Sequence, residues 1–303
     1  TPAPTPAPFQ QDLLISTLDH EVRLCAPPDF ACDTVLLGSR GPGSDSDQLN
    51  KPTIIDVPRD RAYFVVLDEE NNRVQRCPLP GGSPCTTMRG KPELSGPKFI
   101  SLHPTSGELL VLDSCWHGRG PGGYACRRLL RCPADASVAC APVAKPGTVG
   151  DIKMATWHPS GQYYVLCGYL KTGCWRIGED GSVGPVRVTP ADQDIRRMNS
   201  PLRFTEDMVT FQWSGYYATV KIGADGMWGA VREQFFKGEW ANTGSVDIFE
   251  NGDLVGNAMD WHGLSIFTPK PGTLDFGTEV IVTTGVPARI SQVRALQPYV
   301  PQQ

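Results

Sequence analysis

The chain has 303 residues, 40% of them hydrophobic, with 28 Lys and Arg against 32 Asp and Glu and a formal net charge of −4. This balance, without any Lys/Arg cluster, offers no basic surface, and we expect no nucleic-acid partner. The longest apolar runs are five or six residues, as in YFVVL, which is too short to span a membrane. The 32 Gly and 28 Pro indicate a fold with many turns.

The first ten residues, TPAPTPAPFQ, form a Pro-rich segment. We expect it to be an extended linker or tail without a core of its own, either left after processing or serving as a spacer that could carry O-linked sugars. Residues 11–303 are expected to form a single domain. Within it, residues 12–38 come first and contain three short predicted strands.

A repeated pattern follows, with units that start near residues 54, 99, 154, 202 and 246. In each unit a short apolar strand ends in a turn such as HPTSG or HPSG, and a more strongly apolar strand follows. A third strand and a Gly/Pro-rich turn then lead to a fourth. Four short strands without helical periodicity predict a four-stranded antiparallel blade, and blades repeated at this period predict an all-β propeller.

The two ends of the chain complement each other. Residues 288–300, ARISQVRALQPYV, contain a single strand with no unit after it. Pairing this strand with the three strands of residues 12–38 would make a sixth blade and close the ring without an open edge. We therefore expect a six-bladed β-propeller closed by its N- and C-terminal strands.

The ten cysteines fall into neighbouring pairs with six to ten residues between the partners. Such gaps suit opposite strands of one hairpin, whereas structural zinc sites prefer tight C-x₂₋₄-C pairs, which the chain lacks. The predicted disulfides are Cys25–Cys32, Cys77–Cys85, Cys115–Cys126, Cys132–Cys140 and Cys167–Cys174. They indicate a secreted, extracellular protein or another oxidising compartment.

One stretch, NNRVQRCPLPGGSPC after YFVVLDE, resembles the NHL-repeat family, in particular extracellular variants whose third strand ends in a Cys-bridged hairpin. The match is good in the unit from residue 54, fair in those from 12 and 99, and poor beyond residue 200. On this reading three disulfides join the outer two strands of a blade. Cys115–Cys126 and Cys167–Cys174 join the second and third strands.

Candidate catalytic groups are few. His103 and His158 occupy matching HP(T/S)G turns, which favours a turn role for both. Asp68, Asp113 and Asp260 recur near the end of the second strand, where six-bladed hydrolases and lyases hold metal-binding carboxylates. The alternative is that these carboxylates cap turns.

Aromatic residues gather in the loops between the second and third strands, which we expect to share a face with the channel mouth. Aromatic side chains with a polar group are typical of binding faces, although they could equally pack between blades. The candidates are Trp116, His117, Tyr169, Trp213, Tyr216, Trp261 and His262. The bridged, Pro/Gly-rich turns of the opposite face are expected to be inert.

The sequence favours a non-enzymatic extracellular scaffold or recognition module that binds a protein or glycan, possibly within a larger assembly and without a cofactor. The alternative is a metal-dependent hydrolase or lyase of the lactonase or esterase type, because propellers host both kinds of function.

Overall fold

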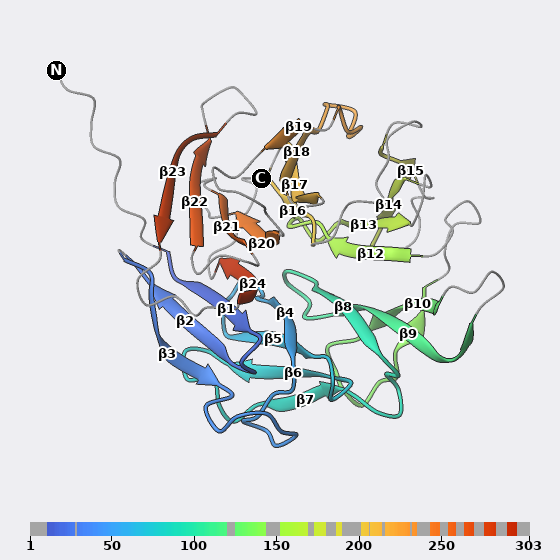
Figure 1. The fold of residues 1–303 in the computed structure, drawn as a ribbon. Helices are drawn as coiled ribbons and strands as arrows, with labels where there is room; N and C mark the ends of the chain where they lie inside the picture. Colours follow the sequence, from blue (N-terminus) through green and yellow to red (C-terminus); the bar gives the residue numbers. More distant parts are fainter. Residues whose placement is uncertain are drawn as a thin grey trace.

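A computed structural model describes residues 11–27, 29–119, 125–143, 152–168, 173–179, 186–189, 201–205, 207–213, 216–230, 232–234, 243–248, 254–258, 264–269, 276–282 and 290–295, in parts of some strands by their backbone alone. These residues form strands and turns, and none of them forms a helix that could cross a membrane. The strands make four-stranded antiparallel sheets, six in the described residues, arranged as the blades of a propeller (Figure 1).

The sheets follow one another along the chain, and their strands are given from the innermost to the outermost. The first contains β24 (Ile290–Ala295), β1 (Leu13–Thr17), β2 (Val22–Ala26) and β3 (Ala31–Leu37). The second contains β4 (Pro52–Asp56), β5 (Tyr63–Asp68), β6 (Arg73–Pro78) and β7 (Thr86–Arg89). The third contains β8 (Pro97–Leu102), β9 (Leu109–Arg119), β10 (Ala125–Cys132) and β11 (Ala141–Pro142).

The remaining three sheets repeat the same order. The fourth contains β12 (Ile152–Trp157), β13 (Tyr163–Gly168), β14 (Cys174–Gly178) and β15 (Val186–Arg187). The fifth contains β16 (Arg203–Phe204), β17 (Met208–Trp213), β18 (Tyr216–Lys221) and β19 (Arg232–Gln234). The sixth contains β20 (Thr243–Ile248), β21 (Leu254–Ala258), β22 (Leu264–Pro269) and β23 (Phe276–Val282).

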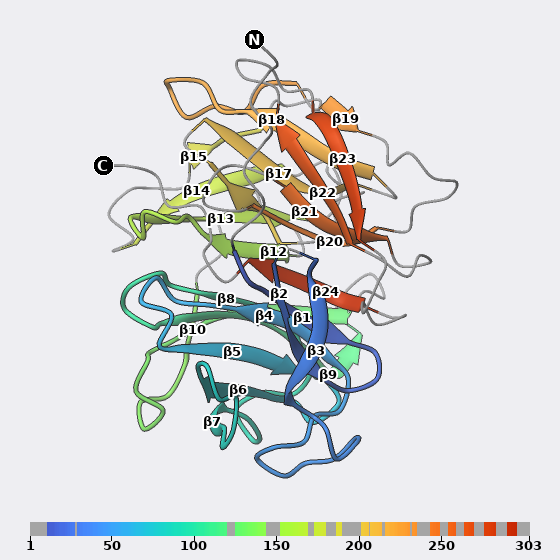
Figure 2. The ribbon, with the colours of Figure 1, turned by 90° about the vertical axis from the view of Figure 1, so that its left-hand side faces the viewer.

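The two ends of the chain meet in the first sheet. Strand β24 pairs antiparallel with β1, with Ile15 opposite Val293 and Leu14 opposite Arg294. Figure 2 shows the red β24 beside the blue β1, although almost the whole sequence separates them. The predicted pairing of residues 288–300 with the strands near residue 12 is therefore present, and it leaves β24 as the innermost strand of this blade.

Burial decreases from the second strand of a blade to the fourth. All six residues of β5 are buried, because neighbouring blades cover both faces of a middle strand. In β6 exposed and buried residues mix, and in β7 the first two residues are exposed. The outer hairpins therefore have little apolar surface to bury, and a covalent link there contributes stability that packing cannot supply.

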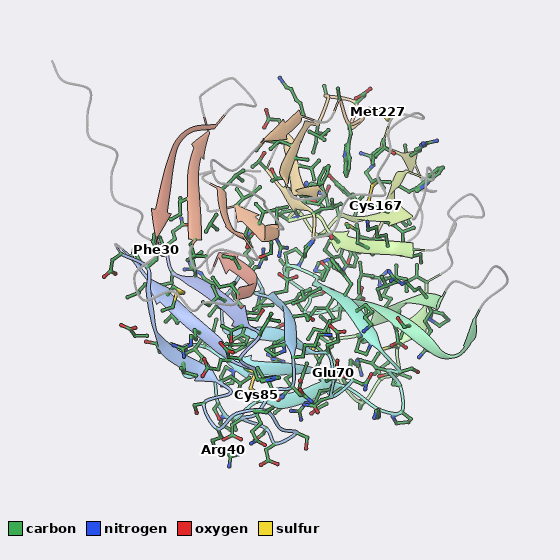
Figure 3. All side chains as sticks on the ribbon, in the orientation of Figure 1. Phe30, Arg40, Glu70, Cys85, Cys167 and Met227 are labelled. Atoms are coloured by element: carbon green, nitrogen blue, oxygen red, sulfur yellow. A yellow bond between two sulfur atoms is a disulfide. The ribbon has the colours of Figure 1, made fainter. Side chains whose placement is uncertain are left out.

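Four of the predicted disulfides are confirmed. Three join the third strand of a blade to its outermost segment, and the fourth joins β13 to β14, with Cα–Cα distances from 4.0 to 4.3 Å. Figure 3 labels a cysteine of two of them, Cys85 and Cys167. The confirmed pairs are Cys25–Cys32, Cys77–Cys85, Cys132–Cys140 and Cys167–Cys174. The predicted Cys115–Cys126 pair lies outside the described side chains.

Candidate functional site

One position of the innermost strands carries a polar side chain in every sheet. Strand pairing defines this position, because in every sheet the polar residue lies opposite the second or third residue of the adjacent strand. All are at least nine-tenths buried, and all line a single cavity. This set, the polar ring, consists of Arg294, Asp56, Ser101, Thr156, Arg203 and Asp247, in the order of the sheets.

The cavity inside the polar ring is small. Its volume is about 60 Å³, room for about four waters or a ligand of similar size. Pro104 and Pro159, which follow the innermost strands of two sheets, also line it. The cavity therefore lies at the end of the blades where the first strand turns into the second.

Arg294 links two buried carboxylates across the ring. Its Nη2 atom is 2.7 Å from Oδ1 of Asp56, and its Nη1 atom is 3.1 and 3.0 Å from the two carboxylate oxygens of Asp247. The exposed fractions of the three side chains are 9%, 6% and 1%. Because Asp56, Arg294 and Asp247 lie on β4, β24 and β20, this network also ties three neighbouring sheets together.

Backbone N–H groups complete the hydrogen bonding of both carboxylates. Asp56 accepts from Val57 N at 3.0 Å and from Leu102 N, on the next sheet, at 2.7 Å. Asp247 accepts from Ile248 N at 2.9 Å. The Ser101 hydroxyl continues the pattern, since it accepts from Trp157 N of the following sheet at 3.0 Å. The polar ring thus stabilises the contacts between adjacent innermost strands.

The ring carboxylates do not fit a divalent metal. A metal ion would have to replace the Arg294 guanidinium, which already lies where a cation bound by both carboxylates would sit. Within the described ranges, no three His, Cys, Asp or Glu side chains gather closely enough to hold a metal ion. The two carboxylates are therefore paired with the Arg294 guanidinium rather than arranged as metal ligands.

Arg203 is less well satisfied than Arg294. Its Nε atom lies 3.1 Å from Oδ1 of Asp247, but without the geometry of a hydrogen bond, and Nη2 has no hydrogen-bond partner among the residues described. Burial lowers the pKa of Arg203 despite the nearby Asp247. At Arg294, burial is outweighed by the two carboxylates, so its pKa is raised. Both guanidinium groups remain charged.

Two more donors belong to residues of the fourth sheet that line the same cavity. The Thr156 hydroxyl and the Trp157 indole N–H are both buried, and neither has a hydrogen-bond partner in the described part of the chain. Buried donors are normally paired, so unpaired ones concentrated around one cavity indicate a place where a further polar group can bind.

The two predicted turn histidines have the expected structural role. His103 Nδ1 accepts from the backbone N atoms of Thr105 and Ser106, and His158 Nδ1 accepts from that of Ser160. Burial lowers the pKa of His158 to about 4, so this imidazole is neutral at neutral pH. Its ring stacks on Tyr163, with 4.4 Å between the ring centroids.

Asp68 and Asp113 lie at the opposite end of the blades from the cavity. Asp68 accepts hydrogen bonds from Asn50 N at 2.7 Å and from Arg73 Nε at 2.7 Å. Asp113 accepts from Gly96 N at 2.8 Å and is paired with Arg128 at 2.8 Å. Both carboxylates therefore tie the start of the first strand of a sheet to its second and third strands. The third candidate, Asp260, lies outside the described residues.

The candidate aromatic residues are described only in part. Trp116 and His117 lie in β9, and Trp213 lies opposite Tyr216 at the end of the β17–β18 hairpin, all of them described by backbone alone. Tyr169, Trp261 and His262 lie outside the described residues. The loops between second and third strands are at the end of the blades opposite the cavity. The aromatic binding face therefore stays a prediction.

The polar ring was missed by reasoning from the sequence. A signal was present, because five of its members lie just before the first turn of a unit: IID56VP, FIS101LHP, MAT156WHP, LR203FTE and VD247IF. When the units are aligned by the strand pairing of the structure, this position is polar in strands that are otherwise apolar.

Comparison with known proteins supports the propeller fold but assigns no function. No family model matches the chain, and no curated protein matches it. A chain of a nidogen/laminin complex superposes with a TM-score of 0.62 at 10% identity, covering 93% of this chain and 97% of that one. The periplasmic gluconolactonase PpgL of Pseudomonas aeruginosa gives 0.58 at 14% identity, covering 94% and 98%. A Lactobacillus plantarum protein gives 0.57 at 14%, covering 95% and 99%.

Proposed function

We propose that this chain is a secreted, non-enzymatic recognition module, a six-bladed NHL-like propeller that presents aromatic loops to a protein or glycan partner. The observation that carries the proposal is the β9–β10 hairpin. Strand β8 pairs with β9 only as far as Asp113, whereas β9 continues to Arg119 and pairs there with β10 alone. Figure 1 shows the far ends of β9 and β10 extending outward at the edge of the molecule. Trp116 and His117 lie on this projecting ribbon.

A projecting two-stranded ribbon suits recognition, because a hairpin alone has too little core to be stable and gains most from contact with a second surface. Trp213 and Tyr216 lie at the corresponding end of the fifth sheet. Trp and Tyr are enriched among the residues that dominate binding energy. Trp261, in the equivalent segment of the sixth unit, extends the proposed face.

The disulfides support the extracellular part of the proposal. Four confirmed disulfides are typical of proteins that fold in an oxidising compartment. They brace the hairpins of four different sheets, so the blades form a rigid support for the binding loops. The nidogen/laminin complex, in which a similar propeller takes part in an assembly, agrees with such a role.

The competing function is a metal-dependent lactonase, esterase or lyase. The pairing of Asp56 and Asp247 with Arg294 argues against it, because those carboxylates are already neutralised. An enzyme of this class would lose thermal stability on treatment with EDTA and would regain it with calcium or zinc. We expect the melting curve to be the same with and without EDTA.

The binding face is tested by Trp116→Ala and Trp261→Ala together, with Val138→Ala, an exposed residue of the opposite face, as control. Binding is measured on a glycan array and against purified extracellular proteins of the source organism. We expect the double variant to lose binding by about 2 kcal/mol or more per aromatic anchor, with an unchanged melting temperature. A double variant that binds as the wild type does, but unfolds more easily by about 3–5 kcal/mol, would show that these residues pack between blades.

A further inference from the structure

We propose that the cavity inside the polar ring is a binding site for a small carboxylate, held by the free edge of the Arg203 guanidinium. This site is separate from the proposed aromatic face, because the two lie at opposite ends of the blades. The proposal rests on the hydrogen-bonding state of the residues around the cavity and on the cavity volume.

The unsatisfied polar atoms of the described structure are concentrated here. Eleven buried side-chain N and O atoms have no hydrogen-bond partner among the described residues, and five of them belong to residues that line this one cavity. The five are Arg203 Nε and Nη2, Arg294 Nε, Thr156 Oγ1 and Trp157 Nε1. Every one of these atoms can donate a hydrogen bond, so the ligand that satisfies them is rich in acceptors.

The two unsatisfied atoms of Arg203 define the shape of that ligand. Nε–H and one N–H of Nη2 point in the same direction from one edge of the planar guanidinium. Two parallel donors of this kind match the two oxygens of a carboxylate in a bidentate pair, the strongest common arrangement of charge-assisted hydrogen bonds. With 7% of its surface exposed, Arg203 is buried deeply enough for such a pair to be shielded from water.

The hydrogen bonds of the ring place an acceptor beside Arg203 rather than elsewhere in the cavity. Arg294 and the backbone N–H groups of Val57, Leu102 and Ile248 already satisfy the two ring carboxylates. Arg203 lies 3.1 Å from an Asp247 oxygen without a hydrogen bond, and Asp56 also acts on its charge. Two arginines and two aspartates make the ring neutral in sum, so the carboxylate binds through the open hydrogen bonds of Arg203 and not through an excess of positive charge.

The volume of the cavity suits a ligand of a few atoms. About 60 Å³ corresponds to about four water molecules, which is similar to the four heavy atoms of acetate. The Thr156 hydroxyl, on the neighbouring sheet, supplies a further donor to the carboxylate oxygens. Phosphate also accepts hydrogen bonds, but its second negative charge would lie near Asp56 and Asp247 without a cation to balance it.

The test is calorimetric titration of the oxidised, full-length protein with sodium acetate, and separately with phosphate, at constant ionic strength in chloride. We expect saturable binding of one acetate per chain, and weaker binding of phosphate. Arg203→Gln should weaken acetate binding by about tenfold or more, because it removes a charge-assisted pair. Lys98→Gln removes a positive charge from the exposed surface and serves as the matched control.

A second variant covers the case in which Arg203→Gln does not fold. Thr156→Val removes a buried hydroxyl that has no hydrogen-bond partner in the described structure, so it should keep the fold and still weaken acetate binding several-fold. Absence of saturable acetate binding to the wild type would overturn the proposal, as would tighter binding of phosphate than of acetate. Equal acetate affinity in the wild type and in Thr156→Val would also overturn it.

Discussion

Replacing Arg294 by Met should destabilise the whole propeller. The change removes the cation that lies 2.7 Å from Asp56 and 3.0 Å from Asp247, so Asp56 loses its ion-pair partner and Asp247 keeps only Arg203, at 3.1 Å. At an effective dielectric constant of about 20, each contact near 3 Å is worth about 5 kcal/mol before desolvation. The backbone donors to both carboxylates remain, so we expect a net loss of about 3–5 kcal/mol, the range found when one partner of a buried pair is removed.

Urea denaturation at pH 7, followed by tryptophan fluorescence, measures this loss. The control is Arg40→Met, which removes an arginine from an ion pair with Asp45 whose side chains are more than half exposed, and which should leave the midpoint close to that of the wild type. The quadruple variant Arg294→Met, Arg203→Met, Asp56→Asn and Asp247→Asn should recover most of the loss, because it leaves none of the four buried charges of the ring unpaired. A loss below about 1 kcal/mol for Arg294→Met, the value of a surface pair, would refute this account of the ring.

Three further predictions concern other parts of the fold. Changing both Cys77 and Cys85 to Ser should lower the free energy of unfolding by about 2–3 kcal/mol, as measured by denaturation under oxidising conditions, since the disulfide closes a short loop. Deleting residues 288–303 should unfold the domain, because the first sheet loses its innermost strand and the ring loses Arg294; a cooperative melt at the wild-type temperature would contradict this. Because the pKa of His158 is lowered to about 4, below its unfolded value near 6.5, its contribution to stability is full above pH 6.5 and is lost as the pH falls toward 4. Stability should fall by roughly 3 kcal/mol over this range, and the dependence should flatten in His158→Asn, which keeps an acceptor for Ser160 N but does not titrate.

The features that could be predicted from the sequence depend on local spacing. The gap between Cys77 and Cys85 fits one hairpin, so their pairing follows from residues that lie close together in the chain. The same holds for His103, whose ring bonds to backbone atoms two and three residues ahead. Local hydrogen bonds and short loops leave a clear pattern because both partners are visible in one stretch of sequence.

The polar ring could not be predicted in the same way, because its partners are far apart in the sequence. Asp56, Asp247 and Arg294 meet only because three innermost strands converge on one axis. In the sequence each appears as a single charged residue beside an apolar strand, which is also what a turn or an exposed strand end contains. Only the ladder register shows that they occupy the same position in different sheets.

The locality of the disulfides has a consequence for how the protein is made. The eight cysteines of the four confirmed disulfides could in principle pair in roughly a hundred ways. Here each confirmed partner is only seven or eight positions away along the chain. During synthesis in an oxidising compartment, each of these eight cysteines would therefore meet its partner before the next of the four confirmed pairs has emerged. Oxidation can proceed in step with synthesis, blade by blade, with little demand on a disulfide isomerase.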